Sequence, residues 1–577
     1  MSKLPNKYHK ILQLIPFILS FALWIYCFGG FVSGQLVLSN DASPYYEHTK
    51  FFIDSLVRGV YPTWDPTWYG GVPNEFFLRR IGSYNPVYLF LGFLVKMGIP
   101  FLSAYLMFLT GYFFLGMIGF YQLSKIVFSD ELVAFIAYLF LMFSTVSTLV
   151  FDSFIMLIFT PSVWFFFFLF AFFKGLREDS SIERLRVFLV GCVFSLMIIN
   201  ITYIPFYFGL VFLLFFTLYG LFYFKDLMKY VLLVGSFAKQ HKKLIFICSL
   251  LSLLSCLPAA MFYFESSRGE FVLPIRHGAQ LNSTNAVEVN AQSTAVGGIL
   301  ATNLLNELFS SGKQLRLGNI YVSIFLFPLM LMGFLGQVSR RSILILLMGI
   351  IVFMISLYDA SPLYDFLYER IFFFKYIRNF QFFLWMLVLP LAVLLSADHL
   401  KQLIEYSRGY RKGKYALVIF IWVIHFCFVM YLRARVNVLW SSYITIMLSG
   451  CLFSLLSLGV FNERKKWLLA VLGILVVGQP VEMYRALNHT AIKFSGYYRY
   501  DENYLDFQYL RGVRKLKGLT HRQWIKERNA DLVSDYAPSR LYYASFWYNY
   551  LYKYVSPDVF EEYLFSKFYV YGDENNL

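Results

Sequence analysis

The chain has 577 residues, of which 59% are hydrophobic and only 15% charged, and its mean hydropathy is +0.59. Soluble domains are about half apolar and about a quarter charged, so this composition excludes an ordinary soluble protein. The formal net charge of +16 would suit nucleic acid in a soluble chain, but here the basic residues gather in short segments between apolar runs. That placement is typical of membrane topology, and nucleic acid is not expected as a partner.

Apolar runs of about 17–25 residues, the length that crosses a bilayer as a helix, recur along the chain. They predict an all-α polytopic membrane protein with about 13 transmembrane helices. The first run is too long for the apolar part of a cleavable signal peptide, so we expect it to be retained. The predicted spans are 11–34, 100–124, 131–150, 156–174, 187–203, 204–224, 244–262, 320–337, 342–358, 380–398, 416–432, 441–460 and 467–484.

The basic segments between these spans predict the orientation. With the N-terminus in the cytoplasm, they alternate as the positive-inside rule requires, with Arg433 and Arg435 as an exception in an outside turn. The odd number of spans places the C-terminus on the exoplasmic side. Residues 1–487 then form a transmembrane module with long exoplasmic loops at 38–83 and 263–319, and residues 488–577 form an aromatic-rich exoplasmic region.

The first exoplasmic loop begins with Asp41, and Tyr45 and His48 follow four and then three residues later. On a helix these three residues share one face. An acid held where a helix leaves the membrane lies in a low dielectric, which tunes it for proton transfer. The alternative interpretation of Asp41 is an ordinary helix N-cap.

The rest of this loop is rich in residues that form turns. Gly59, Trp64 with its following Asp-Pro, and Gly70-Gly71 are expected to fold the loop back over the membrane surface. Tyr84-Asn85-Pro86 then starts an apolar stretch that is too short for a clean span, so we predict an interfacial or re-entrant helix.

Four further charged residues are candidates on the exoplasmic side. Asp152 lies in a short turn between the third and fourth spans, either as a functional acid at the membrane boundary or as an exposed turn residue. Arg268, Lys375 and Arg378 are cations on the side that the positive-inside rule disfavours, which suggests pairing with a phosphate. The alternatives are a carboxylate partner or snorkelling to the interface.

Recognised catalytic motifs are missing from the sequence. It contains no Walker loop, HExxH or GxSxG motif, and its six cysteines show no metal-binding spacing, so no metal site is predicted. The aromatic tail is interpreted as a small domain leaning on the membrane, with stacking on sugar faces as the alternative.

The order of these features resembles the YfhO-type bacterial membrane proteins of the type C glycosyltransferase (GT-C) group. The resemblance covers most of the membrane part. It is carried by Asp41, Gly59, Trp64, Gly70-Gly71, Tyr84-Asn85-Pro86, Pro258 with Ser266-Ser267-Arg268, Gly318-Asn319-Ile320-Tyr321, and the stretch from Phe374-Lys375 to Arg378-Asn379-Phe380.

The resemblance implies a GT-C-like fold in a bacterial plasma membrane and an inverting sugar transfer. The donor would be a polyprenyl-phosphate sugar, and the acceptor an exoplasmic envelope glycan, lipid or protein. Asp41 would be the catalytic carboxylate, with Asp152 as a second acidic residue in the next exoplasmic loop. The residue after Asp41 is Ala42, not a second acid, so an enzyme without a metal or other cofactor is favoured. Substrate and phosphate binding would fall to Arg378, Lys375, Arg268, His48, Tyr45 and Trp64.

Two other functions remain open. A carrier or flippase for a lipid-linked saccharide would use the same cations and aromatic residues without chemistry, although few charges lie within the predicted spans. An assembly partner that docks through its tail is the third possibility.

Overall fold

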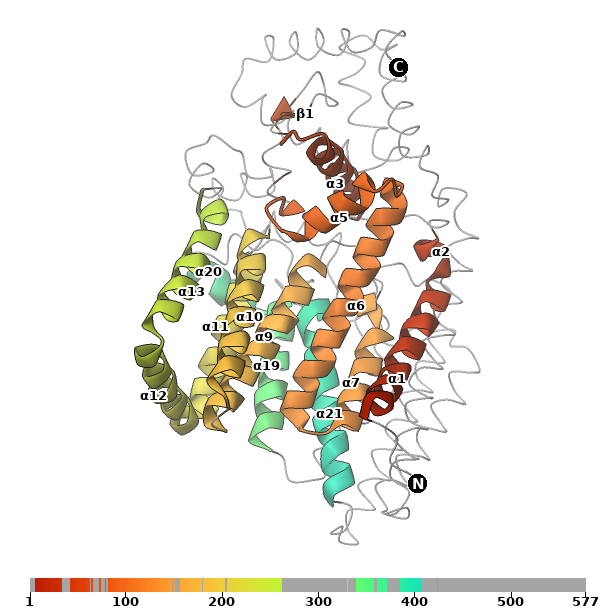
Figure 1. Ribbon diagram of the computed structural model, residues 1–577. Helices are drawn as coiled ribbons and strands as arrows, with labels where there is room; N and C mark the ends of the chain where they lie inside the picture. The colour runs from red at the N-terminus through yellow and green to blue at the C-terminus, as the bar shows by residue number, and fades with distance from the viewer. Residues whose placement is uncertain are drawn as a thin grey trace, which may run out of the picture.

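The computed structural model of the chain (Figure 1) is a bundle of helices with a short two-stranded sheet. It describes residues 6–33, 42–62, 64–65, 72–73, 78, 81–147, 150, 156–178, 180–202, 205–261, 329–330, 339–356, 361–370, 384–406 and 423. The first half of the chain provides α1 (Asn6–Cys27), α2 (Gly29–Val32), α3 (Ala42–Val57), β1 (Trp64–Asp65), β2 (Val72–Pro73), α5 (Val87–Lys96), α6 (Phe101–Phe128), α7 (Glu131–Met142), η1 (Thr145–Ser147), α9 (Met156–Arg177), α10 (Ile182–Ile201), α11 (Pro205–Phe222), α12 (Phe224–Gln240) and α13 (Lys242–Ser255). The second half provides α19 (Arg340–Ser356), α20 (Pro362–Arg370), the π-helix η4 (Leu384–Val388) and α21 (Leu389–Tyr406).

Three helices of the described part are long and apolar enough to cross a membrane: α6, α9 and the helix that runs from Lys242 through α13 to Met261. A fourth candidate is the pair α11 and α12, whose axes are bent by 113° at their junction. The chain is therefore a helical membrane protein, as its composition predicts. Thirteen spans are not confirmed, and the predicted spans 320–337, 416–432, 441–460 and 467–484 lie almost entirely outside the described residues.

The helix α6 is the longest of the described helices and packs against both α7 and α9. Its 28 residues correspond to about 42 Å of α-helix. It ends where Ser129 adopts a left-handed conformation with φ of 53°, and Asp130 then caps α7 by accepting from the backbone N–H groups of Leu132 and Val133. The left-handed Ser129 and the Asp130 cap together form the tight turn between α6 and α7.

Glycines let α6 and α9 approach each other closely. A Cβ added at Gly119 would lie 2.9 Å from Nε1 of Trp164, and one at Gly116 would lie 2.6 Å from Oγ1 of Thr160. The two α9 side chains use this space to donate hydrogen bonds to the α6 carbonyls of Leu115 and Tyr112, both at 3.0 Å. Small residues at such positions are a common device of membrane helix packing.

Two groups of elements mark the two ends of the bundle (Figure 1). At the α3 end, α3 and α5 lie beside the start of α6, and β1 pairs with β2 in antiparallel register. At the opposite, Asp398 end, α6 passes into α7, and α19 begins beside α21. The sequence assigns the first group to the exoplasmic side and the second to the cytoplasmic side, and their separation agrees with that expectation. Which side of the membrane each end faces stays a prediction.

Candidate functional site

At the α3 end, α3 is held by aromatic packing. Tyr46 meets the rings of Phe101 and Tyr105 edge to face, with centroids 5.2 Å away in both cases. One turn and a half further on, Phe52 packs against Tyr88 of α5 at 5.8 Å. Tyr46 and Phe52 are both 2% exposed. The first predicted exoplasmic loop therefore starts as a helix that shares the core of the bundle.

Polar side chains are buried beneath this helix. Thr49 is fully buried beside Tyr88, whose hydroxyl donates to the carbonyl of Ile81 at 2.6 Å. Asn85 is 1% exposed, and its Oδ1 accepts from the N–H of Val87 at 3.1 Å, which fixes the start of α5. The short helix predicted after Tyr84-Asn85-Pro86 is thus present as α5.

The chain between α3 and α5 turns on glycines. Gly59 and Gly82 have positive φ values of 79° and 67°, which side chains rarely adopt. A Cβ at Gly82 would also lie 3.5 Å from the carbonyl oxygen of Ile201, at the end of α10. The hydroxyls of Tyr61 and Ser83 are 3.0 Å apart and join the two turns. Gly59 thus lies in a turn, as predicted, whereas Gly70-Gly71 lies outside the described residues and the folding of the loop over the membrane surface stays a prediction.

The predicted site residues are only partly within the described residues. Tyr45 lies in α3 and packs, half-buried, against the main core. His48 belongs to the same helix, three residues further on, and Trp64 belongs to β1. The other predicted site residues lie outside the described residues: Asp41, Asp152, Arg268, Lys375 and Arg378. Because α3 begins at Ala42, Asp41 occupies the sequence position of its N-cap, and both interpretations of this residue stay predictions.

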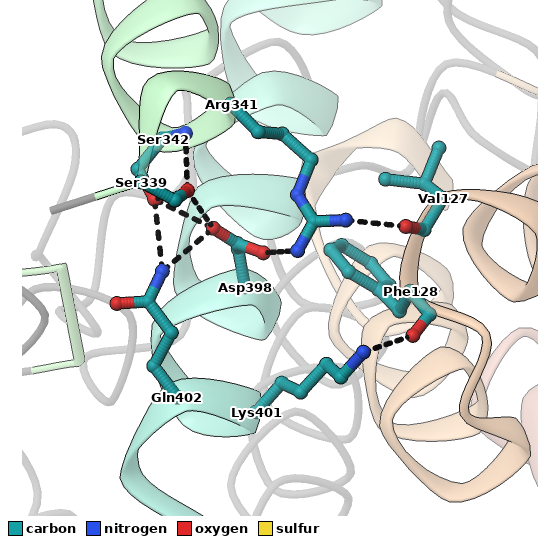
Figure 2. A network of polar contacts seen from close by, with 8 residues as sticks. All are labelled: Val127, Phe128, Ser339, Arg341, Ser342, Asp398, Lys401 and Gln402. Atoms are coloured by element: carbon teal, nitrogen blue, oxygen red, sulfur yellow. Dashed lines mark hydrogen bonds and ion pairs between the residues drawn. The ribbon is translucent and has the colours of Figure 1, made fainter. Parts of the chain in front are cut away.

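The Asp398 end contains a polar cluster that sequence reasoning missed (Figure 2). Asp398 is fully buried and pairs with Arg341. Its Oδ2 accepts hydrogen bonds from Ser342 at 2.5 Å, Gln402 at 3.0 Å and Ser339 at 3.2 Å. Both carboxylate oxygens are therefore engaged, and the arrangement suits a structural tie between α19 and α21.

The cations of this cluster also cap the end of α6 (Figure 2). Arg341 donates to the carbonyl of Val127 at 2.6 Å, and its guanidinium lies 5.5 Å from the ring centre of Phe128. Lys401 donates to the carbonyl of Phe128 at 2.5 Å. The last carbonyls of a helix lack partners within the helix and carry partial negative charge, so cations stabilise them. A carboxylate at the very end of the predicted span 380–398 was the available sequence signal for Asp398.

Within the described residues, no group of three or more His, Cys, Asp or Glu side chains could hold a metal ion. Comparison with known proteins gives no matching family model and no matching curated sequence.

Proposed function

We propose that the protein is a membrane glycosyltransferase that moves a sugar from a polyprenyl-phosphate donor to an acceptor of the cell envelope. It would act on the exoplasmic face of a bacterial plasma membrane, with the α3 end on that face. The proposed reaction follows from the resemblance of the sequence to the type C glycosyltransferase group. The geometry of the α3 end supports placing the reaction site there.

One observation carries this location: α3 is built into the core at the end of the bundle. Tyr46, Thr49 and Phe52 are buried along its inner side. A helix fixed in this way supports a positioned group at the residue that precedes it, which is Asp41 in the sequence. Positioning within fractions of an ångström is a main source of catalytic rate, so a fixed helix is a better support for a catalytic acid than a free loop.

In the proposed reaction, the carboxylate of Asp41 takes the proton of an acceptor hydroxyl. The acceptor oxygen bonds to the anomeric carbon, and the bond to the phosphate oxygen breaks with its electron pair, inverting the configuration. Arg378, Lys375 and Arg268 would neutralise the polyprenyl phosphate that leaves. Tyr45, His48 and Trp64 would contact the sugar, and Asp152 would be the second acid of the site.

The test is sugar transfer by the purified, reconstituted protein with a radiolabelled polyprenyl-phosphate hexose. Asp41→Asn is expected to abolish transfer without changing expression or unfolding temperature. Glu47→Gln is the matched control, because it also removes one negative charge. Glu47 lies in α3, and helical spacing places it on a different face from Tyr45 and His48.

Full transfer by the Asp41→Asn variant would overturn the assignment of this residue. Movement of the labelled lipid across the bilayer without transfer would instead support the flippase. If the protein shows neither transfer nor movement, the assembly function is supported.

A further inference from the structure

The helix α12 is docked on the bundle by one side only. Phe237 is 5% exposed and meets the ring of Phe172 on α9 edge to face at 5.4 Å. Tyr230, two turns earlier, lies 5.0 Å from the ring of Phe173. This side of α12 forms a small core with α9, α10 and α13. The predicted spans 204–224 and 244–262 leave the segment 225–243, with its five lysines, as a basic connection on the cytoplasmic side.

Three lysines lie on the exposed surface of α12, in a sector that also contains Leu232, which is 71% exposed. Lys225, Lys229 and Lys239 are exposed and fall within one sector of the helix at 100° per residue, away from Phe237. Two more exposed lysines, Lys242 and Lys243, follow at the start of α13. The helix contains one acidic residue, Asp226, so its exposed face carries excess positive charge.

Between the docked side and the lysines lies an exposed apolar flank. Phe224, Val231 and Met228 are 62%, 55% and 46% exposed. The flank leads along the chain to α13, a candidate span in which only 11% of the most apolar window is buried within the described structure. Such a helix is expected to face acyl chains, and α12 leads directly into it along the chain. This continuity favours a lipid environment over a protein partner for the flank.

The bend at the α11–α12 junction sets the direction of α12. With an angle of 113°, α12 does not continue α11 across a bilayer (Figure 1). An amphipathic helix with lysines beside a large apolar flank, placed crosswise to its neighbours, has the properties of helices that lie in the membrane interface.

We infer that α12 lies in the plane of the membrane surface and holds anionic phospholipid headgroups. Phe224, Met228 and Val231 enter the acyl region, while Lys225, Lys229 and Lys239 extend to the phosphates, where each lysine is attracted by the negative surface. The inference rests on the insertion of the neighbouring helices in a membrane and does not require glycosyl transfer.

Hydrogen–deuterium exchange of the full-length protein in nanodiscs tests this inference. Nanodiscs of phosphatidylcholine alone are compared with nanodiscs that also contain phosphatidylglycerol. We expect the amides of α12 to exchange several-fold more slowly with phosphatidylglycerol, and the triple variant Lys225→Gln, Lys229→Gln, Lys239→Gln to lose this difference. The matched control is the triple variant Arg177→Gln, Arg184→Gln, Arg186→Gln, which removes the same charge from exposed positions of α9 and α10. This control should still show slower exchange of α12 with phosphatidylglycerol.

A second variant tests the apolar flank. Phe224→Ser with Val231→Ser should speed exchange of α12 in both lipids, because loss of insertion does not depend on headgroup charge. The inference is overturned if phosphatidylglycerol leaves α12 unchanged in the wild type, or if the control loses the effect as fully as the lysine variant. Unchanged exchange in the flank variant would likewise exclude insertion.

Discussion

The two ends of α6 are stabilised by different physics. At the Asp398 end, an ion pair, serine hydroxyls and two capping cations tie α6, α19 and α21 together. At the α3 end, aromatic rings hold α3 and α5 against the start of α6, and polar groups such as Thr49 and Asn85 lie beneath them.

Under the proposed function, this difference separates a structural end of the bundle from a substrate-binding end. A carboxylate that already accepts hydrogen bonds at both oxygens, as Asp398 does, has little capacity left for a substrate. The α3 end instead combines buried polar groups with a helix that follows a candidate catalytic acid in the sequence. Three substitutions test whether the ends differ in this way, in order of decreasing expected effect on stability.

Asp398→Ala should have the largest effect. It leaves the guanidinium of Arg341 without its carboxylate. Loss of one partner of a fully buried pair costs roughly 3–5 kcal/mol, and because the Arg341 side chain is 36% exposed we expect a loss toward or below the lower end of that range. Unfolding of the detergent-solubilised protein should show this loss. Adding Arg341→Met should cost much less in the Asp398→Ala background than in the wild type, because the two residues act as one unit. If Arg341→Met lowers the free energy of unfolding equally in both backgrounds, Arg341 and Asp398 do not act as a structural tie.

Tyr88→Phe should have an intermediate effect at the α3 end. It removes the hydroxyl that donates to the carbonyl of Ile81 and leaves that acceptor unpaired, at a cost of about 1 kcal/mol. Exchange of the α3 and α5 amides should rise while that of α21 stays constant. The matched change Tyr84→Phe, at a side chain 52% exposed, should alter neither. An equal rise in amide exchange in α3, α5 and α21 would show that the two ends are not independent.

Lys125→Gln should have the smallest effect, although it also breaks an ion pair at the Asp398 end. The side chains of Lys125 and its partner Glu131 are 43% and 60% exposed, and such pairs contribute at most about 1 kcal/mol. High salt should reduce even this contribution in unfolding measurements. A loss comparable to that of Asp398→Ala would mean that charge, and not burial, stabilises this end.

Much of the membrane fold could be predicted because apolar length is a strong signal. The predicted spans 100–124 and 156–174 correspond to α6 and α9, and Gly59 marks a turn with the positive φ that glycine permits. Boundaries were less accurate where tertiary contacts intervene. The predicted span 131–150 is helical in α7 only to Met142, after which the chain passes into the short helix η1.

The Asp398 cluster could not be derived from periodicity, whereas α12 has the spacing of an amphipathic helix in its sequence. The cluster joins residues far apart in sequence, and nothing local shows that Arg341 meets Asp398. The segment 225–243 was recognised by its lysines, but the docking of Phe237 against α9 is a tertiary contact that local sequence does not show. For the candidate site, the helical expectation that relates Tyr45 to His48 is met by α3, while the convergence of Asp41, Asp152 and Arg378 stays a prediction.

The capping of α6 has a consequence for biosynthesis. Val127 and Phe128 receive their cations from residues 214 and 273 positions later in the chain. A chain that enters the membrane in order of synthesis must therefore hold the end of α6 uncapped until Arg341 and Lys401 have been made. At about 5–20 residues per second, this interval lasts on the order of 10–50 s. During that time water or lipid headgroups must solvate these carbonyls, so the last described helix completes the assembly that the early helices begin.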